Sequence, residues 1–279
     1  MKFTDKNIDL SSPRIMGILN LTPDSFSDGG DYTQVDKALR HTQQMLAQGA
    51  DFIDVGGEST RPGAADVSVQ QELDRVIPVI EAIKKRFDTV VSIDTSKAVV
   101  MTEAVMAGAA FINDVRALRE PSALEAASAA GVPVCLMHMQ GQPRSMQSAP
   151  IYVDVVAEVY GFLQDRIAAC EKAGIDKSQI IVDPGFGFGK SLEHNFQLLE
   201  HFESFHELAV PVLAGMSRKS MLGQLLGRDV TERLAGSIVL ATIAAQKGAQ
   251  IIRVHDVKQT VDAVKIVSKL NAYRKNNER

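Results

Sequence analysis

A short unit recurs along the chain: a stretch of helical pattern, a glycine, and then a run of apolar residues that ends in a polar one. A glycine directly after a helix supplies the left-handed residue that ends it. The apolar runs lack polar alternation, which is typical of strands buried on both faces. The unit appears as AQGADFIDVGG, MAGAAFINDV, AAGVPVCLMH, KAGIDKSQIIVDPG and KGAQIIRVHD. The recurrence indicates a chain built from βα units.

Eight apolar runs are candidate strands. They span residues 15–20, 52–56, 89 or 90–94, 111–115, 132–138, 180–184, 211–215 and 251–255. Helical patterns such as residues 67–87 and 153–174 lie between them. Eight strands alternating with eight helices in about 250 residues favour a closed (β/α)₈ TIM barrel in the α/β class. Periodicity alone leaves an open doubly wound sheet as the alternative. Because no low-complexity linker divides the chain, we expect residues 1–279 to form a single domain.

Composition limits the classes of partner and compartment. A hydrophobic content of 45% fits a globular protein, and a formal net charge of −4 argues against a nucleic-acid partner. The first ten residues contain no apolar run, so we expect no secretory signal. The longest apolar stretch, residues 234–245, is too short to span a membrane. Cys135 and Cys170 are interpreted as buried free thiols, which predicts a cytoplasmic protein without a membrane partner.

The segments that follow three of the predicted strands are long. They comprise residues 20–33, 56–67 and 138–150 and are rich in Gly, Ser and Asp. Segments that lead from helix to strand are mostly tight. In barrels, binding and catalytic residues lie in the loops that follow the strands. The long loops therefore predict that the active site lies at the carboxyl ends of the strands.

Polar residues end most of the predicted strands. They are Asn20, Asp54, Asp94, Asn113 with Asp114, His138, Asp183, Arg253 and His255. Any one of them is compatible with a helix cap or an ion-pair partner. So many polar groups meeting at one barrel mouth instead predict a ligand or a dense polar network, because unpaired buried polar groups are costly.

The acids favour a particular kind of ligand. A carboxylate accepts two parallel hydrogen bonds from the edge of a 2-amino-4-oxo heterocycle, such as guanine or a pterin, and Asp183 suits this role. Asn113 would add a donor and an acceptor, and Lys219 would reach a ring carbonyl. An alternative takes the acids with His138 and His255 as metal ligands of a hydrolase, although the sequence has no HxH or HExxH pair.

Two segments after later strands bear on anion binding. Residues 184–191, PGFGFGKS, fail both glycine-rich phosphate patterns by one position, so we interpret them as a turn that lets backbone approach a ligand. In residues 216–226 we expect Ser217 to cap a helix with Arg218 and Lys219 in its first turn. Cations oppose the helix dipole there, which favours a bound anion.

The last predicted strand carries two further cationic candidates. Arg253 and His255 are two residues apart and therefore point to the same side of the strand, together with Ile251. Facing Asn20 across the barrel closure, they would form a diphosphate clamp.

With these residues in place, the sequence resembles the dihydropteroate synthases, the folate-pathway enzymes that sulfonamides inhibit. The resemblance covers residues 14–275. It is carried by MGILNLTPDSFSDGG, DVGGESTRPGA, SIDTSK, INDV, LMHMQG, DPGFGFGK, GMSRKS and RVHD. It implies a transferase that joins 6-hydroxymethyl-7,8-dihydropterin diphosphate to p-aminobenzoate, releasing diphosphate and 7,8-dihydropteroate. The family is commonly dimeric, which implies a homodimer.

The resemblance also implies roles for individual residues. The pterin would be held by Asp94, Asn113, Val115, Met137, Asp183, Phe188, Gly215 and Lys219. The diphosphate would be held by Thr60, Arg61, Arg253, His255 and Asn20, the last through Mg²⁺. The p-aminobenzoate site, which is also the sulfonamide site, would comprise Phe26, Thr60, Pro62, Phe188, Lys219 and Ser220. The residues expected to act in catalysis are Asp94, Lys219, Arg253 and His255.

Two other functions fit the same barrel. A pterin-binding methyltransferase would share the acids and Asn113 but would expel no diphosphate, and the segments STRPG, SRKS and RVHD argue against it. A barrel that binds pterin or phosphate without turnover is the second alternative.

Overall fold

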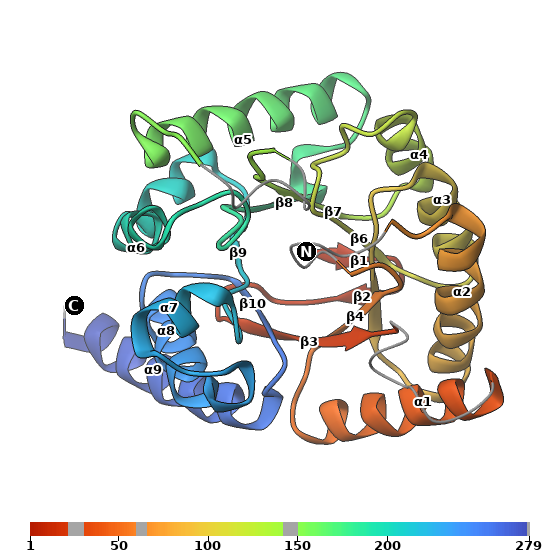
Figure 1. The fold of residues 1–279 in the computed structure, drawn as a ribbon, viewed down its shortest axis with the longest axis horizontal. Coiled ribbons are helices and arrows are strands. Elements are labelled where there is room, and N and C mark those ends of the chain that lie inside the picture. Colours follow the sequence, from red (N-terminus) through yellow and green to blue (C-terminus); the bar gives the residue numbers. More distant parts are fainter. Residues whose placement is uncertain (22–30, 60–65, 142–149, 278–279) are drawn as a thin grey trace.

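The computed structural model describes residues 1–21, 31–59, 66–141 and 150–277, and eight of its strands form one parallel sheet (Figure 1). The strands are β3 (Arg14–Asn20), β4 (Phe52–Gly56), β5 (Val90–Asp94), β6 (Phe111–Asp114), β7 (Val134–Met137), β8 (Ile180–Asp183), β9 (Leu213–Ala214) and β10 (Ile251–Val254). The sheet order is β8-β7-β6-β5-β4-β3-β10-β9. A bridge between Val182 and Val212 joins its two edges, and Val182 N donates to Pro211 O at 3.0 Å. The predicted TIM barrel is therefore confirmed, and the open doubly wound sheet is excluded.

Helices surround the strands on all sides (Figure 1). They are α1 (Asp31–Ala47), α2 (Val69–Arg86), α3 (Ala98–Met106), α4 (Ala123–Ala130), α5 (Val155–Lys172), α6 (Leu192–Glu200), α7 (Ser220–Leu226), α8 (Leu234–Gln246) and α9 (Val257–Asn277). Short 3₁₀ helices span Lys177–Gln179, Phe202–Leu208 and Val230–Glu232. The expected one helix per strand holds except after β9, where both α7 and α8 precede β10.

The glycines of the recurring unit adopt the backbone conformation that was predicted for them. Gly49, Gly108, Gly131, Gly174 and Gly248 have φ values between +65° and +114°. Side chains are strained in this region of φ, so glycine ends each helix there with little cost and turns the chain into the next strand.

Prolines explain three of the differences between the predicted and observed strand ends. Strand β7 begins after Pro133, β8 ends before Pro184, and β9 begins after Pro211, whereas the predicted runs included all three prolines. Proline has no N–H to donate to a neighbouring strand, so it falls outside the ladder.

A short hairpin closes the end of the barrel at which the strands begin. Strands β1 (Lys2–Phe3) and β2 (Lys6–Asn7) pair with each other, and Phe3 is fully buried. The ring centroid of Phe3 lies 5.1 Å from that of Phe52 and 5.5 Å from that of Phe111. The hairpin was not predicted, because strands of two residues carry no readable periodicity.

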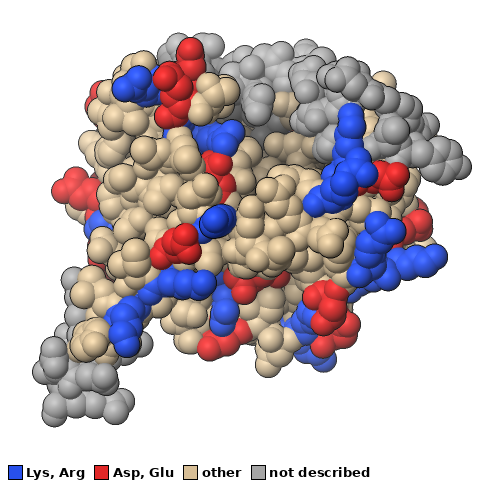
Figure 2. Space-filling model, turned by 90° about the horizontal axis from the view of Figure 1, so that it is seen from below, with Lys and Arg blue, Asp and Glu red and all other residues tan. Residues whose placement is uncertain are grey.

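The cysteines, the helices and one face of the described chain bear on the expectations drawn from composition. Both cysteines are buried free thiols, and no helix of the described residues is long and apolar enough to cross a membrane. The side of the molecule seen from below Figure 1 mixes charges of both signs around a wide uncharged area (Figure 2). That face therefore presents no broad region of positive charge to a polyanion.

Candidate active site

The inner wall of the barrel changes from apolar to polar along the strands. The apolar layer includes Phe52, Phe111, Ile181 and Ile251. Two residues further along the same strands stand Asp54, Asn113, Asp183 and Arg253. Since residues two apart in a strand face the same side, these four side chains enter the barrel above the apolar layer, near the carboxyl ends of the strands. The polar layer lies where barrels hold their active sites.

Arg253 connects two carboxylates across the mouth of the barrel. Its Nε donates to Asp54 Oδ2 at 2.6 Å, and its Nη2 donates to Asp94 Oδ2 at 2.7 Å. Although burial alone lowers the pKa of the Arg253 guanidinium, the two carboxylates outweigh this and raise it. The predicted orientation of Arg253 into the barrel, on the same side as Ile251, is confirmed.

The surroundings of Asp94 shift its pKa strongly. The pKa of Asp94 is raised to about 7, chiefly by burial; the charge of Arg253 opposes this rise, and the carboxylates of Asp54 and Asp114 add to it. Asp94 therefore exchanges its proton near neutral pH.

Asp183 is buried in the polar layer, beside Gly215. Its Oδ1 accepts a hydrogen bond from Gly185 N at 2.7 Å. A Cβ atom at position 215 would lie 3.8 Å from both Asp183 Oδ2 and Arg253 Cβ. Glycine at position 215 thus leaves room between these two charged groups. Burial raises the pKa of Asp183, and the nearby ammonium of Lys219 opposes this effect.

Lys219 reaches the mouth from the segment between β9 and α7. Its Nζ donates to the carbonyl of Phe186 and lies 4.4 Å from the centre of the Phe188 ring. Burial lowers the pKa of Lys219 to about 8, although the charge of Asp183 opposes this. The ammonium is thus held by a carbonyl oxygen and an aromatic face.

Four apolar side chains line the mouth as a cluster separate from the main core. They are Val115, Met137, Met139 and Phe188. Three of them were expected as walls for a flat ring. Met139 was not named, because in the sequence it is one methionine among ten.

His255 and the segment before α7 differ in part from expectation. Ser217 is no helix cap: its Oγ accepts His255 N at 3.2 Å and lies 3.0 Å from His255 Nδ1. Arg218 lies outside the helix and forms a two-point ion pair with Asp256, at 2.9 and 2.5 Å. Lys219 is the cap residue and Ser220 is the exposed first residue of α7. The expected first-turn cations were wrong because α7 begins two residues later.

Asn20, at the end of β3, and Asp94 both lie next to Gly56. A Cβ atom at position 56 would lie 3.7 Å from Asn20 Oδ1 and 3.8 Å from Asp94 Oδ2. Within the described residues, no group of three or more His, Cys, Asp or Glu side chains has the geometry of a metal site. The alternative of a hydrolase whose metal is bound by acids and histidines therefore finds no support in this part of the chain.

His138 does not join the polar layer, contrary to expectation. It follows Met137, which faces inward, so its ring points the other way and lies 2.9 Å from the Nζ of Lys190. Lys190 is 2% exposed and also donates to Gly185 O at 2.9 Å and Phe188 O at 3.1 Å. Burial and the Lys190 charge lower the pKa of His138 to about 2. This pair fastens the glycine-rich turn that carries Phe188.

Asp114 also has a structural role. Its carboxylate accepts hydrogen bonds from Ser96 Oγ and from Arg116 N and Leu118 N, the last two at 2.8 and 2.7 Å. It thus organises the turn after β6 while its neighbour Asn113 faces the barrel.

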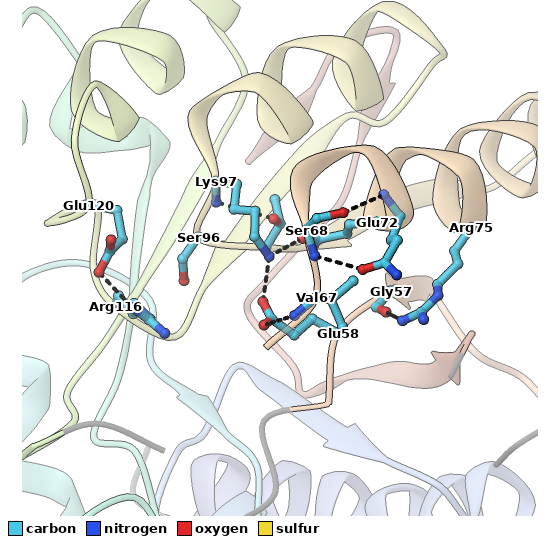
Figure 3. A network of polar contacts seen from close by, with 12 residues as sticks. Gly57, Glu58, Val67, Ser68, Glu72, Arg75, Ser96, Lys97, Arg116 and Glu120 are labelled. Carbon is cyan, nitrogen blue, oxygen red and sulfur yellow. Dashed lines mark hydrogen bonds and ion pairs between the residues drawn. The ribbon is translucent and has the colours of Figure 1, made fainter. Parts of the chain in front are cut away.

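A second polar network lies beside the polar layer, where β4 and β5 lead into their helices (Figure 3). Lys97 donates to Glu58 Oε2 at 2.6 Å and to the fully buried Glu72 at 2.5 Å. Glu58 in turn accepts Val67 N at 3.2 Å. The network ties together residues on both sides of 60–65, and it was not predicted from the sequence. Thr60, Arg61, Pro62 and Phe26 lie outside the described residues.

Known proteins that resemble this chain point to one family. Residues 16–255 match the model of the family described as "Pterin binding enzyme". The chain is 58% identical over 261 residues to the dihydropteroate synthase of Escherichia coli (strain K12), covering 94% of this chain and 93% of that protein.

Two solved structures are similarly close. The Yersinia pestis dihydropteroate synthase with a sulfonamide drug has a TM-score of 0.94 and 57% identity, covering 98% of this chain and 99% of that one. The Xanthomonas albilineans dihydropteroate synthase with 4-aminobenzoic acid has a TM-score of 0.89 and 54% identity, covering 94% of each chain. The chain therefore belongs to the pterin-binding enzyme family and, within it, to the dihydropteroate synthases.

Proposed function

We propose that this chain joins 6-hydroxymethyl-7,8-dihydropterin diphosphate to p-aminobenzoate, releasing diphosphate and forming 7,8-dihydropteroate in folate biosynthesis. The observation that carries the proposal is the polar layer of Asp54, Asn113, Asp183 and Arg253 at the barrel mouth, with Asp94 and Lys219 beside it. The relatives solved with a sulfonamide drug and with 4-aminobenzoic acid support the second substrate.

In this proposal the pterin ring lies against the apolar cluster and meets polar groups at its edge. Asp183 accepts from the ring N–H and amino group, Asn113 bonds a ring nitrogen, and Lys219 donates to the ring carbonyl. Val115, Met137 and Phe188 supply the walls, and Gly215 leaves the space for the ring. The closeness of Asp183 to Gly215 supports this placement.

The diphosphate is assigned to Arg253, His255 and Asn20 with Thr60 and Arg61. The bonds of Arg253 to Asp54 and Asp94 use two of the five N–H donors of a guanidinium, which leaves donors for an anion. His255 is held in position by Ser217.

A Mg²⁺ ion fits this site only together with the substrate. Mg²⁺ in phosphate sites binds one or two protein oxygens plus substrate phosphates, and Asn20 Oδ1, next to Gly56, is a suitable hard oxygen donor. When bound, the ion would neutralise charge on the departing diphosphate.

The remaining residues of the proposed p-aminobenzoate site surround Lys219. Lys219 lies over the Phe188 ring, and Ser220 directly follows Lys219 in the chain. Phe26, Thr60 and Pro62 complete the set by the family resemblance.

Charge separation explains why these residue types suit the reaction. Diphosphate leaves a carbon attached to an electron-rich dihydropterin, so C–O cleavage runs ahead of attack by the amine. The carboxylate of Asp94 then stabilises the developing pterin cation while Arg253 and His255 hold the leaving group. The arylamine is already neutral near pH 7 and needs no strong general base.

The test is an assay of the purified protein with dihydropterin diphosphate, p-aminobenzoate and Mg²⁺. We expect diphosphate release that depends on p-aminobenzoate and matches the formation of dihydropteroate. Pterin binding without such product would favour the non-catalytic barrel, and transfer of a methyl group would favour the methyltransferase.

We further propose that the chain works as one cytoplasmic domain and forms a homodimer. Large apolar side chains are exposed on α7, α8 and α9 or beside them. They are Leu225, Leu226, Val230, Leu234, Val239, Ile266, Leu270 and Tyr273. This set, the α7–α9 apolar face, is what a second copy of the chain would cover.

A further inference from the structure

Asp54 holds two of the proposed site residues through one oxygen atom. Its side chain is fully buried, and its Oδ2 accepts from Arg253 Nε at 2.6 Å and from Asn113 Nδ2 at 3.2 Å. Among the described residues, Oδ1 of the same carboxylate has no hydrogen-bond partner. The sequence pattern marked Asp54 only as a polar residue near a strand end.

The bond to Asp54 decides which way the Asn113 amide faces. A carboxylate paired with an arginine has acceptors and no donor, so it binds the amide group of Asn113 only through its NH₂. The carbonyl oxygen of Asn113 is then turned away from Asp54. Because Asn113 is 4% exposed, an amide turned the wrong way would find few substitutes for these bonds.

The same oxygen fixes the guanidinium of Arg253. A second bond, from Nη2 to Asp94, sets the plane of the guanidinium across the mouth. With one acceptor lost, the group would keep a single anchor and could rotate about it. Asp54 thus determines where both a neutral amide and a cation present their remaining hydrogen-bonding atoms.

We propose that Asp54 is a positioning residue for the pterin substrate: it turns the carbonyl oxygen of Asn113 toward the ring and holds Arg253 for the diphosphate. The proposal rests on the proposed function, because it assigns Asp54 a role within that site. According to this proposal, affinity for the pterin ring depends on the hydrogen-bond acceptor Oδ2 of Asp54 and not on the negative charge of Asp54 alone.

Two substitutions separate the acceptor from the charge. In Asp54→Asn, the amide oxygen takes the place of Oδ2 and accepts both bonds, while its NH₂ occupies the place of Oδ1. In Asp54→Leu, both acceptors are lost while the branched shape of the side chain is kept, and Asp54→Ala removes them without added bulk. Ser92→Ala is the matched control, because Ser92 pairs with Asp54 on the adjacent strand and its buried hydroxyl has no partner among the described residues.

The measurement is calorimetric affinity for the pterin alcohol, 6-hydroxymethyl-7,8-dihydropterin, with thermal unfolding of every variant. We expect Asp54→Asn and Ser92→Ala to stay within about threefold of the unchanged chain, and Asp54→Leu and Asp54→Ala to bind at least tenfold more weakly. In an Asn113→Ala background, loss of the Asp54 acceptor should cost less than threefold, because the amide through which Asp54 acts is gone.

Two results would overturn the proposal. One is pterin affinity in Asp54→Leu and Asp54→Ala equal to that in Asp54→Asn, whether because none of the three loses binding or because all three lose it. The other is an equal loss in the presence and absence of the Asn113 side chain, which would show that Asp54 acts on the fold alone. If the unchanged chain bound no pterin, the proposed function would fail first, so the two failures are distinguishable.

Discussion

The carboxyl of Asp94 and the ammonium of Lys219 titrate close together, with pKa values of about 7 and about 8. Both shifts have burial as their largest cause, and both move the group toward its neutral form. Burial therefore brings two groups with very different ordinary pKa values into the same narrow range of pH. The charges at the barrel mouth are consequently more sensitive to pH than those of exposed acids and lysines.

This predicts a narrow pH dependence of pterin binding. Affinity for the pterin alcohol should rise as Asp94 loses its proton near pH 7 and fall as Lys219 loses its charge near pH 8. Lys219→Arg should remove the alkaline decline, because arginine stays protonated throughout this range. Calorimetry between pH 5.5 and 9.5 measures both the rise and the fall of pterin affinity. If affinity falls at alkaline pH in Lys219→Arg as it does in the unchanged chain, Lys219 is not the cause of that fall.

A second prediction concerns the edge of the ring. Asp183→Asn keeps the shape but places an amide donor where the ring also donates, so pterin affinity should fall by about 2–4 kcal/mol. Asp165→Asn, at an exposed position on α5, is the matched control. Equal pterin affinity for both variants would remove Asp183 from the pterin site.

Among the elements, strands and helix ends could be predicted, whereas contacts between loops could not. Apolar runs are properties of the local sequence, and so are the glycines that end helices, such as Gly49 and Gly174. In contrast, the pairing of Lys190 with His138 joins residues 52 positions apart. No local pattern distinguishes a buried lysine from an exposed one. The same holds for Lys97, whose partners lie on another βα unit.

The polar layer could be predicted only in part. Arg253 could be placed in the barrel from its spacing to Ile251, and the same spacing relates Asp54 to Phe52. The signal for Asp54 was thus present in the sequence. Its partners were not, since they depend on which side chains reach across the barrel.

The turn between β8 and α6 gives a prediction at the scale of an element. Lys190→Met leaves buried carbonyl oxygens without a donor and should destabilise the fold by about 3 kcal/mol or more. It should also weaken pterin binding, because Phe188 lies on this turn. Urea unfolding and pterin calorimetry check the two effects, with Lys177→Met at an exposed position as control. Stability equal to that of the control would mean that Lys190 does not hold the turn.

In the molecule as a whole, the proposed active site and the proposed dimer face lie on different parts of the barrel. The polar layer lies near the carboxyl ends of the strands, and the hairpin packs on the apolar layer below it. Helices α7, α8 and α9 lie together on one flank (Figure 1). A dimer formed through the α7–α9 apolar face would leave the mouth open to substrate. This separation makes the oligomeric state testable without touching the site.

The corresponding prediction is that a charge on the α7–α9 apolar face breaks the dimer. Val239 is 56% exposed and Ile266 71% exposed, so Val239→Lys with Ile266→Glu should give a monomer by sedimentation velocity. Met106→Lys, at a 77% exposed residue on α3, should leave the dimer intact. A dimer that survives the paired change, or a monomeric parent chain, would contradict the assignment of this face.

The most direct test is a crystal structure of the chain with 6-hydroxymethyl-7,8-dihydropterin diphosphate. We predict that the flat ring lies on Val115, Met137 and Phe188, with its amino edge on Asp183 and its phosphates toward Arg253. A ring bound in another cavity, or phosphates directed away from Arg253, would contradict the proposed site.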